Sequence, residues 1–383
     1  MERRAVDRGV NPATYCVGDY DYWVAARQDE STVRDLLARI ATGGRMQLTF
    51  RREPDALDSD FDSVAHGYIL ARNRRSGENV GLCERVVREC FVNGEIRALP
   101  YLAGLRVVRG FRHRLLVLRG GFEAVRRLLA APQDLPWSLT SIMSDNASAR
   151  RVLSAKLKGM PHYEPVGEYS TFALLPGGDA QGEQAGFSDL AGIATLLMRQ
   201  GAQRQFAACW RAETLESFAR NGWLAPRDYF LVRGNAGVGG TGGRVRACAA
   251  LWDQSAHRQL VVSGYSPWLR RLRPLVNLGA RFAGLPRLPA PGEPLRAAWL
   301  SHVAVEQEDD LLALLGAARA EARRRGLHVV FTGWPSSHPF AERVRQFARG
   351  REYRSQLYVV RWPEDEAPAL DPALPVMPEL ALL

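Results

Sequence analysis

The chain has 383 residues, of which 46% are hydrophobic and 24% charged, and its formal net charge is +10. This length exceeds what one hydrophobic core usually supports, so we expect two domains. The five cysteines are scattered and include no C-x-x-C pair, which argues against a disulfide framework and against a metal site. The sequence shows neither a secretory signal nor an apolar stretch long enough to span a bilayer, so we expect a cytoplasmic protein with no membrane partner.

The hydrophobic pattern defines a first unit over residues 19–175, preceded by an N-terminal extension over residues 1–18. Polar, turn-forming residues at 74–79 and the pair Asn93-Gly94 separate neighbouring strands. The expected strands are 23–29, 66–73, 80–94, 101–107, 138–143 and 166–175. The expected helices are 30–40, about 115–129 and 146–158.

The most informative stretch is residues 101–129, where a buried strand turns through a cluster of arginines into a helix. Apolar residues recur in the helix at three- and four-residue steps and give it one apolar face: Leu115, Leu118, Phe122, Val125 and Leu129. Residues 97–127 hold eight arginines and one acid, so the segment carries about +7. A helix that begins at such a bend presents unpaired N–H groups and a positive dipole end, which predicts a phosphate site. An ordinary basic, solvated helix face is the alternative.

Residues 176–186 lack an apolar pattern and read as a linker to a second unit over residues 187–362. The expected strands of this unit are 228–234, 244–253, 259–266, 297–305, 328–334 and 355–362. Its expected helices are 190–202, 310–326 and 339–350. The order of elements repeats that of the first unit, so we hypothesise an internal duplication. The Pro-rich tail, residues 363–383, is expected to be disordered.

The strand–turn–helix at 101–129 and the helix opened by Asn146 resemble the GCN5-related N-acetyltransferase (GNAT) family. The second unit resembles a divergent copy, so the resemblance covers nearly the whole chain between residues 19 and 362. It implies an α/β (α+β) fold with two GNAT-like domains in tandem. Each domain would be a mixed, mostly antiparallel sheet flanked by helices, with the fourth strand splayed from the fifth. It also implies that acetyl-CoA, as co-substrate, lies in that cleft of the N-terminal half.

The resemblance also assigns roles to individual residues around this cleft. The strand end would offer backbone groups to the pantetheine amides through Leu105, Arg106 and Val107. The pyrophosphate would rest on the N–H groups of Arg112, His113, Arg114, Leu115 and Leu116. Asn146 matches the asparagine that touches the far end of the cofactor. The family's loop usually has alternating glycines after its arginine, and the matching positions here are His113, Leu115 and Val117.

The expected acid and base depart from the family pattern. Many members carry a tyrosine seven residues after the asparagine, which protonates the departing thiolate, but Leu153 stands at that position. The nearest substitute is Tyr163, in the following loop. Glu84 and Glu89 on the third strand are candidate general bases, and their spacing lets at most one of them point inward. Of the two, Glu84 is our candidate. His66 has no metal-ligand partner at a useful spacing and reads as a structural residue.

The second unit differs from the first at the place of the phosphate site. Its fourth strand ends at Val305, and the turn after it contains four acids: Glu306, Glu308, Asp309 and Asp310. Their charges would repel a pyrophosphate. We therefore expect this half to be a degenerate copy that completes the substrate cleft or stabilises the first half.

Together these features predict an acetyl-CoA-dependent N-acetyltransferase that acts on a primary amine of unknown identity, either a small molecule or a peptide. A catalytically inactive acyl-CoA-binding sensor or scaffold of the same fold is the alternative, because Leu153 replaces the tyrosine and the turn lacks the glycines. A nucleic-acid-binding protein would use the arginines of 97–127 on phosphates. Base-stacking aromatic residues are sparse there, which disfavours nucleic acid. The sequence leaves the oligomeric state open.

Overall fold

The structure of the protein is a computed structural model, which describes residues 14–39, 45–58, 61, 63–112, 114–234, 243–347, 350–366 and 369–383. None of the helices formed by these residues is both long enough and apolar enough to cross a membrane. The same residues contain no group of three or more His, Cys, Asp or Glu side chains that is placed to hold a metal ion.

In the first half of the chain, most of the strands precede residue 110. Its strands are β1 (Tyr15–Val17), β2 (Tyr20–Val24), β3 (Met46–Arg51), β4 (Ala65–Asn73), β5 (Asn79–Val92), β6 (Glu95–Val107), β7 (Ser138–Met143) and β8 (His162–Leu174). Its helices are α1 (Glu30–Arg39), α2 (Leu115–Leu128) and α3 (Ala147–Leu153). The strand expected at 23–29 is wrong in its second part. The chain leaves the sheet after Val24 because the Asp29 carboxylate accepts the Ala26 N–H at 2.9 Å and the Trp23 indole N–H at 3.1 Å, which closes a short 3-10 turn.

The second half repeats this order with additional helices. Its strands are β9 (Glu183–Gln184), β10 (Tyr229–Arg233), β11 (Val245–Trp252), β12 (Gln259–Tyr265), β13 (Ala297–Val305), β14 (Val329–Pro335) and β15 (Gly350–Arg361). Its helices are α4 (Leu190–Gly201), α5 (Ala212–Arg220), α6 (Pro267–Phe282), α7 (Glu308–Arg324) and α8 (Pro339–Phe347). Helices α5 and α6 have no counterpart among the expected elements.

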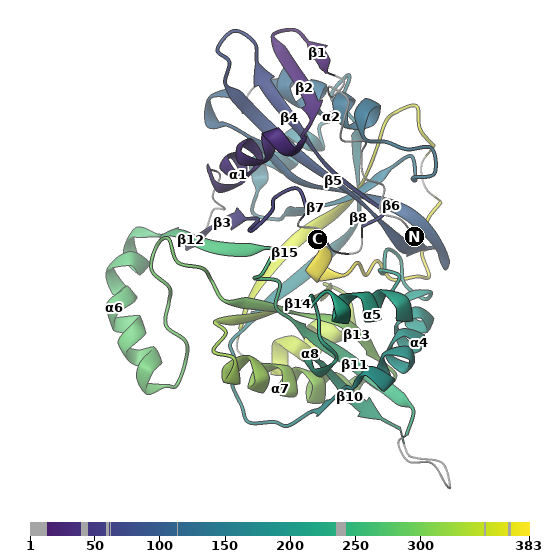
Figure 1. Cartoon of the computed structure of the whole chain (residues 1–383), viewed down its shortest axis with the longest axis vertical. Coiled ribbons are helices and arrows are strands. Elements are labelled where there is room, and N and C mark those ends of the chain that lie inside the picture. The colour runs from purple at the N-terminus through teal and green to yellow at the C-terminus, as the bar shows by residue number, and fades with distance from the viewer. Residues whose placement is uncertain are drawn as a thin grey trace.

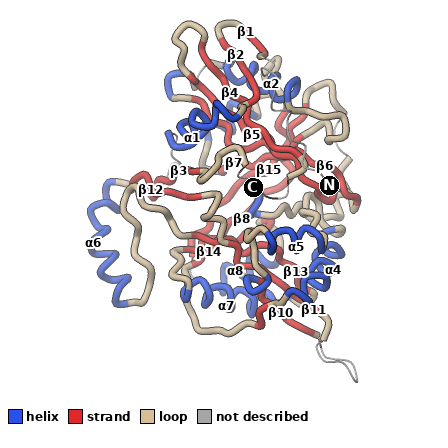
Figure 2. Tube along the Cα trace, viewed as in Figure 1, coloured by secondary structure: helices blue, strands red, loops and turns tan. Residues whose placement is uncertain are grey.

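One continuous sheet runs through both halves, as Figures 1 and 2 show. Its strand order is β1-β2-β4-β5-β6-β7-β15-β8-β14-β13-β11-β10-β9. The pairs β6–β7 and β13–β14 are parallel, and the other described pairs in the sheet are antiparallel. The strands of each half are thus mixed and mostly antiparallel, as predicted, but the two sets join into one sheet.

The two halves exchange their last strands. Strand β15, from the end of the second half, pairs with β7 of the first half from Ser138 to Met143. Strand β8, from the end of the first half, pairs with β14 of the second half. Strands β8 and β15 also pair with each other along their lengths, so each half supplies a strand that the other half needs. The expected units therefore do not close on themselves.

Helices cover both faces of this sheet. In the first half, α2 packs on one face against β2, β4, β5 and β6, and α1 packs on the opposite face against β4 and β5. In the second half, α7 and α8 lie on one face and α4 and α5 on the other. A second, two-stranded sheet of β3 and β12 joins the halves at one side.

The C-terminal tail is ordered over its described residues, contrary to the expected disorder. Gln205 N–H donates to the Pro375 carbonyl, and Met377 N–H donates to the Gln205 carbonyl, each at 2.9 Å. Met377 and Leu382 are buried, because the last residues are apolar enough to offset the proline content of the segment. The expected linker 176–186 also contains structure, since β9 within it pairs with β10.

We predict that the first half does not fold alone. Without β15, residues 14–186 would expose the unpaired edge of β7 and lose the buried side chains of Tyr358 and Val360 from the core beneath α2. Circular dichroism should show a broad thermal transition for this fragment, and co-expression with residues 187–383 should restore a sharp one. A sharp, cooperative transition for the isolated fragment would contradict the exchange as a folding requirement.

Two neighbouring glycines provide a second test, of the packing of α2. A Cβ added at Gly120 would lie 2.4 Å from the buried Tyr22 ring, whereas one at Gly121 would be no closer than 4.0 Å to it. Gly120→Ala should lower the free energy of unfolding by about 1–3 kcal/mol. Gly121→Ala, the matched control, should be neutral or stabilising by up to about 1 kcal/mol. Urea unfolding measures both, and equal effects would mean that Tyr22 does not set the approach of α2.

Candidate functional site

Strand β6 separates from β7 partway along its length. The two strands meet at one register pair, Tyr101 with Leu139, and the Thr140 hydroxyl donates to the Leu102 carbonyl at 2.7 Å. From there β6 continues to Val107, paired only with β5. Among the described residues no strand pairs with this last stretch on its other side. This stretch of β6 therefore lacks a strand partner on one side among the described residues, as expected for the fourth strand.

A β-bulge lies in this separated stretch. Leu82 of β5 pairs with Arg106, whereas Glu84 pairs with Ala103, so β6 contains one extra residue between these two pairs. Gly104 supplies the bulge with a φ of +58°, a conformation that residues with a side chain rarely adopt. The bulge turns the backbone at Leu105 away from the regular ladder.

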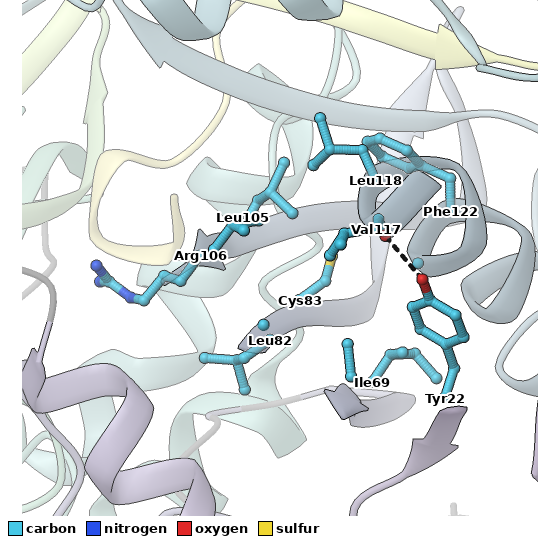
Figure 3. Close-up of a pocket in the computed structure, with 13 residues that line it drawn as sticks. Tyr22, Ile69, Leu82, Cys83, Leu105, Arg106, Val117, Leu118 and Phe122 are labelled. Atoms are coloured by element: carbon cyan, nitrogen blue, oxygen red, sulfur yellow. Dashed lines mark hydrogen bonds between the residues drawn. The ribbon is translucent and has the colours of Figure 1, made fainter. Parts of the chain in front are cut away.

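A narrow pocket lies between this stretch and α2 (Figure 3). Its free volume is about 20 Å³, room for roughly one water molecule. The backbone of 105–107 forms one wall, while Cys83, Leu118 and Phe122 point into it. Arg106 points away from the pocket, and its guanidinium lies over the Phe50 ring at 5.2 Å. The predicted residues Leu105, Arg106 and Val107 are thus among those that line this pocket.

The turn between β6 and α2 is cationic and exposed. The side chains of Arg109, Arg112 and Arg114 are all in contact with solvent, and Arg112 Nε donates to the Val107 carbonyl at 3.2 Å. The Arg114 N–H donates to the Phe111 carbonyl at 2.9 Å, so the turn itself uses this predicted phosphate donor. Leu115 and Leu116, the first residues of α2, have no acceptor within the helix for their N–H groups. The predicted residue His113 lies outside the described part of the chain.

On the opposite face of the sheet, Glu84 is the centre of a buried polar cluster. Its Oε1 accepts hydrogen bonds from His66 Nε2 at 3.0 Å and from the Tyr68 hydroxyl at 3.1 Å. Its Oε2 lies 3.7 Å from Arg52 Nη2. A Cβ added at Gly104 would lie 3.4 Å from the same Oε2, so the carboxylate touches the bulge. Of the two candidate bases Glu84 is therefore the one that points inward, and Glu89 forms an ion pair with Arg211 nearer the surface.

The cluster keeps Glu84 ionised. Burial acts to raise the pKa of the carboxyl, but the charge of Arg52 and the hydrogen bond from His66 outweigh it and hold the pKa well below its usual range. Such a carboxylate is a weak proton acceptor by itself. It can instead orient His66 and hold positive charge beside the bulge. Burial also raises the pKa of Cys83, on the pocket side of the same strand, to about 12, so that thiol stays protonated.

The remaining predicted residues, Tyr163 and Asn146, lie in the core and at the start of α3. Tyr163 is buried, and its ring packs edge-on against Phe122 and Tyr358 with centroids 6.2 and 5.8 Å apart. Burial raises the pKa of its phenol well above the usual value, with a further contribution from Cys83. Leu153, at the family's tyrosine position, lies in the same core cluster. Asn146 caps α3, and its Oδ1 accepts the Ala149 N–H at 3.2 Å.

In the second half, β13 likewise separates from β14, and residues of the C-terminal tail lie beside the point of separation. Strand β13 pairs with β14 only from Ala297 to Trp299, and a bulge at His302, with a φ of +52°, repeats the one at Gly104. The space of about 50 Å³ beside it is lined by tail residues 377–380. Glu379 accepts the His302 N–H at 3.0 Å, and burial lowers the pKa of His302 to about 3. The matching bulges support the duplication, and the tail lies beside the second of them.

Several residues of the site were not among the sequence-based candidates. His66 was expected to be structural, and Tyr68, Arg52 and Gly104 were not singled out. A signal was present for two of them: His66 and Tyr68 alternate on β4, which places both on the face of Glu84 once β4 and β5 pair. A signal for the bulge was also present, because an isolated glycine inside a strand pattern, here Gly104, is typical of a bulge.

The depressed pKa of Glu84 predicts a pH-dependent contribution to stability. A carboxyl with a lower pKa in the folded state stabilises the protein above its unfolded-state pKa of about 4.5, and this contribution is lost as the pH falls below that value. Glu84→Gln should therefore lower the free energy of unfolding by about 2–3 kcal/mol at neutral pH, and by progressively less below about pH 4.5. Glu89→Gln, the control on the same strand, should cost less than about 1 kcal/mol. A cost for Glu84→Gln that does not change with pH would contradict this account.

Comparison with solved structures finds N-myristoyltransferase from Saccharomyces cerevisiae. Its crystal structure with bound myristoyl-CoA matches with a TM-score of 0.56 and 12% identity, over 97% of this chain and 92% of that chain. A second structure, with myristoyl-CoA and inhibitors, matches with a TM-score of 0.57 and 10% identity, over 97% and 89%. A GCN5-related N-acetyltransferase from Sphaerobacter thermophilus matches with a TM-score of 0.45 and 15% identity, over 80% and 83%.

No family model matches the sequence, and no curated protein matches it. Identities this low carry the arrangement of the chain in space and nothing further. The protein therefore has the tandem GNAT fold of N-myristoyltransferase.

Proposed function

We propose that this protein is an acyl-CoA-dependent N-acyltransferase whose N-terminal half binds the acyl-CoA and transfers its acyl group to a primary amine. The observation that carries the proposal is the bulge at Gly104, on a strand edge that no described strand covers, with the Glu84 cluster on one face and the pocket beneath α2 on the other. This arrangement provides an open backbone edge, a cationic turn and a proton-handling pair within one stretch of β6.

The residues present fit a coenzyme A thioester, which supplies an activated acyl group. The open edge of 105–107 can hydrogen-bond the pantetheine amides, as the resemblance implies. Arg112, Arg114 and the N–H groups of Leu115 and Leu116 give the diphosphate positive charge and donors. Bulky side chains replace the family's glycines, so this cradle depends on helical N–H groups and arginine charge rather than on close backbone approach.

The Glu84–His66 pair supplies the base in this proposal. The amine must lose a proton before its nitrogen attacks the thioester carbonyl, and a C–N bond then forms while the C–S bond breaks. His66 donates Nε2–H to Glu84, which leaves Nδ1 as the proton acceptor, and the Glu84 charge stabilises the imidazolium. In this proposal the Leu105 N–H, at the bulge, stabilises the oxyanion. The raised pKa of Tyr163 makes it a weak acid, so the leaving thiolate takes its proton from solvent.

The size of the pocket favours a short acyl group, with acetyl-CoA as the proposed donor. The space beneath α2 is about 20 Å³ and is closed by Leu118, Phe122 and Tyr22. A long acyl chain would have to displace much of this core, whereas an acetyl group needs only a small widening of the pocket. The yeast N-myristoyltransferase structures hold myristoyl-CoA, so chain length is the point on which this protein and that neighbour would differ.

A binding protein without turnover is the second candidate function. Leu153 and the buried Tyr163 leave the pocket without an exposed phenol near the thioester, and this observation favours an acyl-CoA sensor. The two functions share the binding step and differ only in acyl transfer.

The binding step is tested by isothermal titration with acetyl-CoA and with myristoyl-CoA. We predict binding of acetyl-CoA that Leu105→Trp weakens at least about tenfold, because the indole would fill the open edge of β6. Leu175→Trp is the matched control, since both leucines are similarly exposed, at 40% and 42%, and Leu175 lies at the far end of β8. The absence of heat with either thioester would refute the proposal.

Turnover is followed by thiol release with a panel of small and peptide amines. The enzyme proposal expects release that His66→Gln reduces at least about 100-fold while acetyl-CoA binding persists. Tight binding with no release against any amine would establish the sensor instead.

A further inference from the structure

Helix α6 is an amphipathic helix in which no residue is buried. Its exposed apolar side chains are Trp268, Leu272, Leu275, Val276, Leu278 and Phe282. Two of them, Leu275 and Phe282, are 66% and 83% exposed. Figure 1 shows the helix standing apart from the sheet at the left of the molecule, beside β12. Exposed apolar side chains grouped on one element mark an interaction surface.

The apolar face of α6 points away from the protein. The contacts of the helix with the body come from Leu269, Arg273 and Asn277, at successive four-residue steps. Asn277 bonds both backbone groups of Leu288, at 2.7 and 3.2 Å. The exposed apolar residues lie on the other side of the helical wheel, centred about half a turn from this contact stripe. The side that globular helices normally bury is here the side that faces solvent.

The sequence around this face is cationic. Residues 254–292 contain no Asp or Glu, and α6 itself carries Arg270, Arg271, Arg273 and Arg281. Arg271 lies within the apolar face, and Arg270 and Arg281 lie at its border. Arg45, from the segment that precedes β3, adds a further guanidinium over the Trp268 ring at 5.4 Å. A partner that covers this face must therefore accept both apolar side chains and positive charge.

We propose that α6 docks on the surface of a phospholipid bilayer that carries anionic headgroups, and lies in the plane of the interface. An apolar face of Trp, Leu and Phe bordered by arginines, with no acid, is the combination that inserts to the depth of the headgroups while the guanidinium groups bind lipid phosphate. The helix lies on the bilayer and does not span it, so this contact differs from the membrane span that the sequence excludes. The inference goes beyond the proposed acyl transfer and does not depend on it.

A second copy of the chain fits this face less well. A symmetric contact between two α6 helices would bring Arg270, Arg271 and Arg281 of one copy against the same residues of the other. No acid on the helix is available to pair with them. Lipid phosphate offers the opposite charge, and the acyl region beneath it accepts Leu275 and Phe282.

The test is co-sedimentation of the full chain with vesicles of phosphatidylcholine alone or mixed with phosphatidylglycerol. We expect strong partitioning to the mixed vesicles and weak partitioning to phosphatidylcholine. Leu275→Ser combined with Phe282→Ser should lower the partition coefficient at least about tenfold. Arg270→Gln combined with Arg271→Gln should lower it about tenfold on mixed vesicles only. Phe187→Ser is the matched control, because Phe187 is 64% exposed and lies in the second half, away from α6.

Unchanged circular dichroism and melting temperature of the variants would show that they fold, as expected for exposed positions. Equal partitioning to both kinds of vesicle, or retention of binding by the Leu275/Phe282 variant, would overturn the proposal. The proposal would also be overturned if the chain did not bind vesicles and instead formed a dimer, seen by analytical ultracentrifugation, that the Leu275/Phe282 variant abolishes. That result would assign the face to a second copy.

Discussion

The separation of β6 from β7 is the constraint on which the site depends. Parallel strands normally continue side by side, and here they share only the register pair Tyr101–Leu139 before they diverge. The bulge at Gly104 makes the divergence local, because an extra residue bends β6 and increases its twist while β5 continues straight. The pocket, the cationic turn and the start of α2 all lie on the far side of this bend. A regular strand at 103–106 would pair with its neighbour and leave no open edge.

The bend also explains why a charged cluster is buried in the middle of the sheet. Glu84 is opposite the bulge, and the missing side chain at Gly104 leaves room for its carboxylate. Isolated, such a charge would cost several kcal/mol, and the hydrogen bonds from His66 and Tyr68 together with Arg52 offset that cost. An apolar residue at position 84 alone would leave Arg52 and His66 without their shared partner, so the cluster is stable only as a unit.

The helices and strands that were predicted correctly are those with a clear local pattern of apolar residues. Strand β13 and helix α2 lie where their sequence patterns put them, because β13 is a mostly apolar run buried on both faces and α2 buries one apolar face. The exchange of β8 and β15 was not predictable in this way. The residue pattern of β8 and of β15 would be the same whether the strand paired with β7 or with β14. The choice of partner therefore depends on how the two halves pack together.

For the C-terminal tail, the proline-rich composition led to the wrong prediction, because a few apolar residues at its end are buried. Helix α6 was missed because its apolar residues face solvent and its Pro274 lies inside the helix.

The two halves show how one fold can keep or lose a ligand site. In the first half the turn after β6 carries arginines, and the edge of the strand is open. In the second half the turn after β13 carries acids, and Glu306 is held by Arg199 and Arg244 while Asp310 is held by Arg246. A diphosphate there would compete with these ion pairs. The tail lines the space beside His302 with apolar side chains and the Glu379 carboxylate. Reversal of charge at the turn and the contacts of the tail thus distinguish the second half from the first by independent means, and only the first half keeps the features on which the proposed acyl transfer rests.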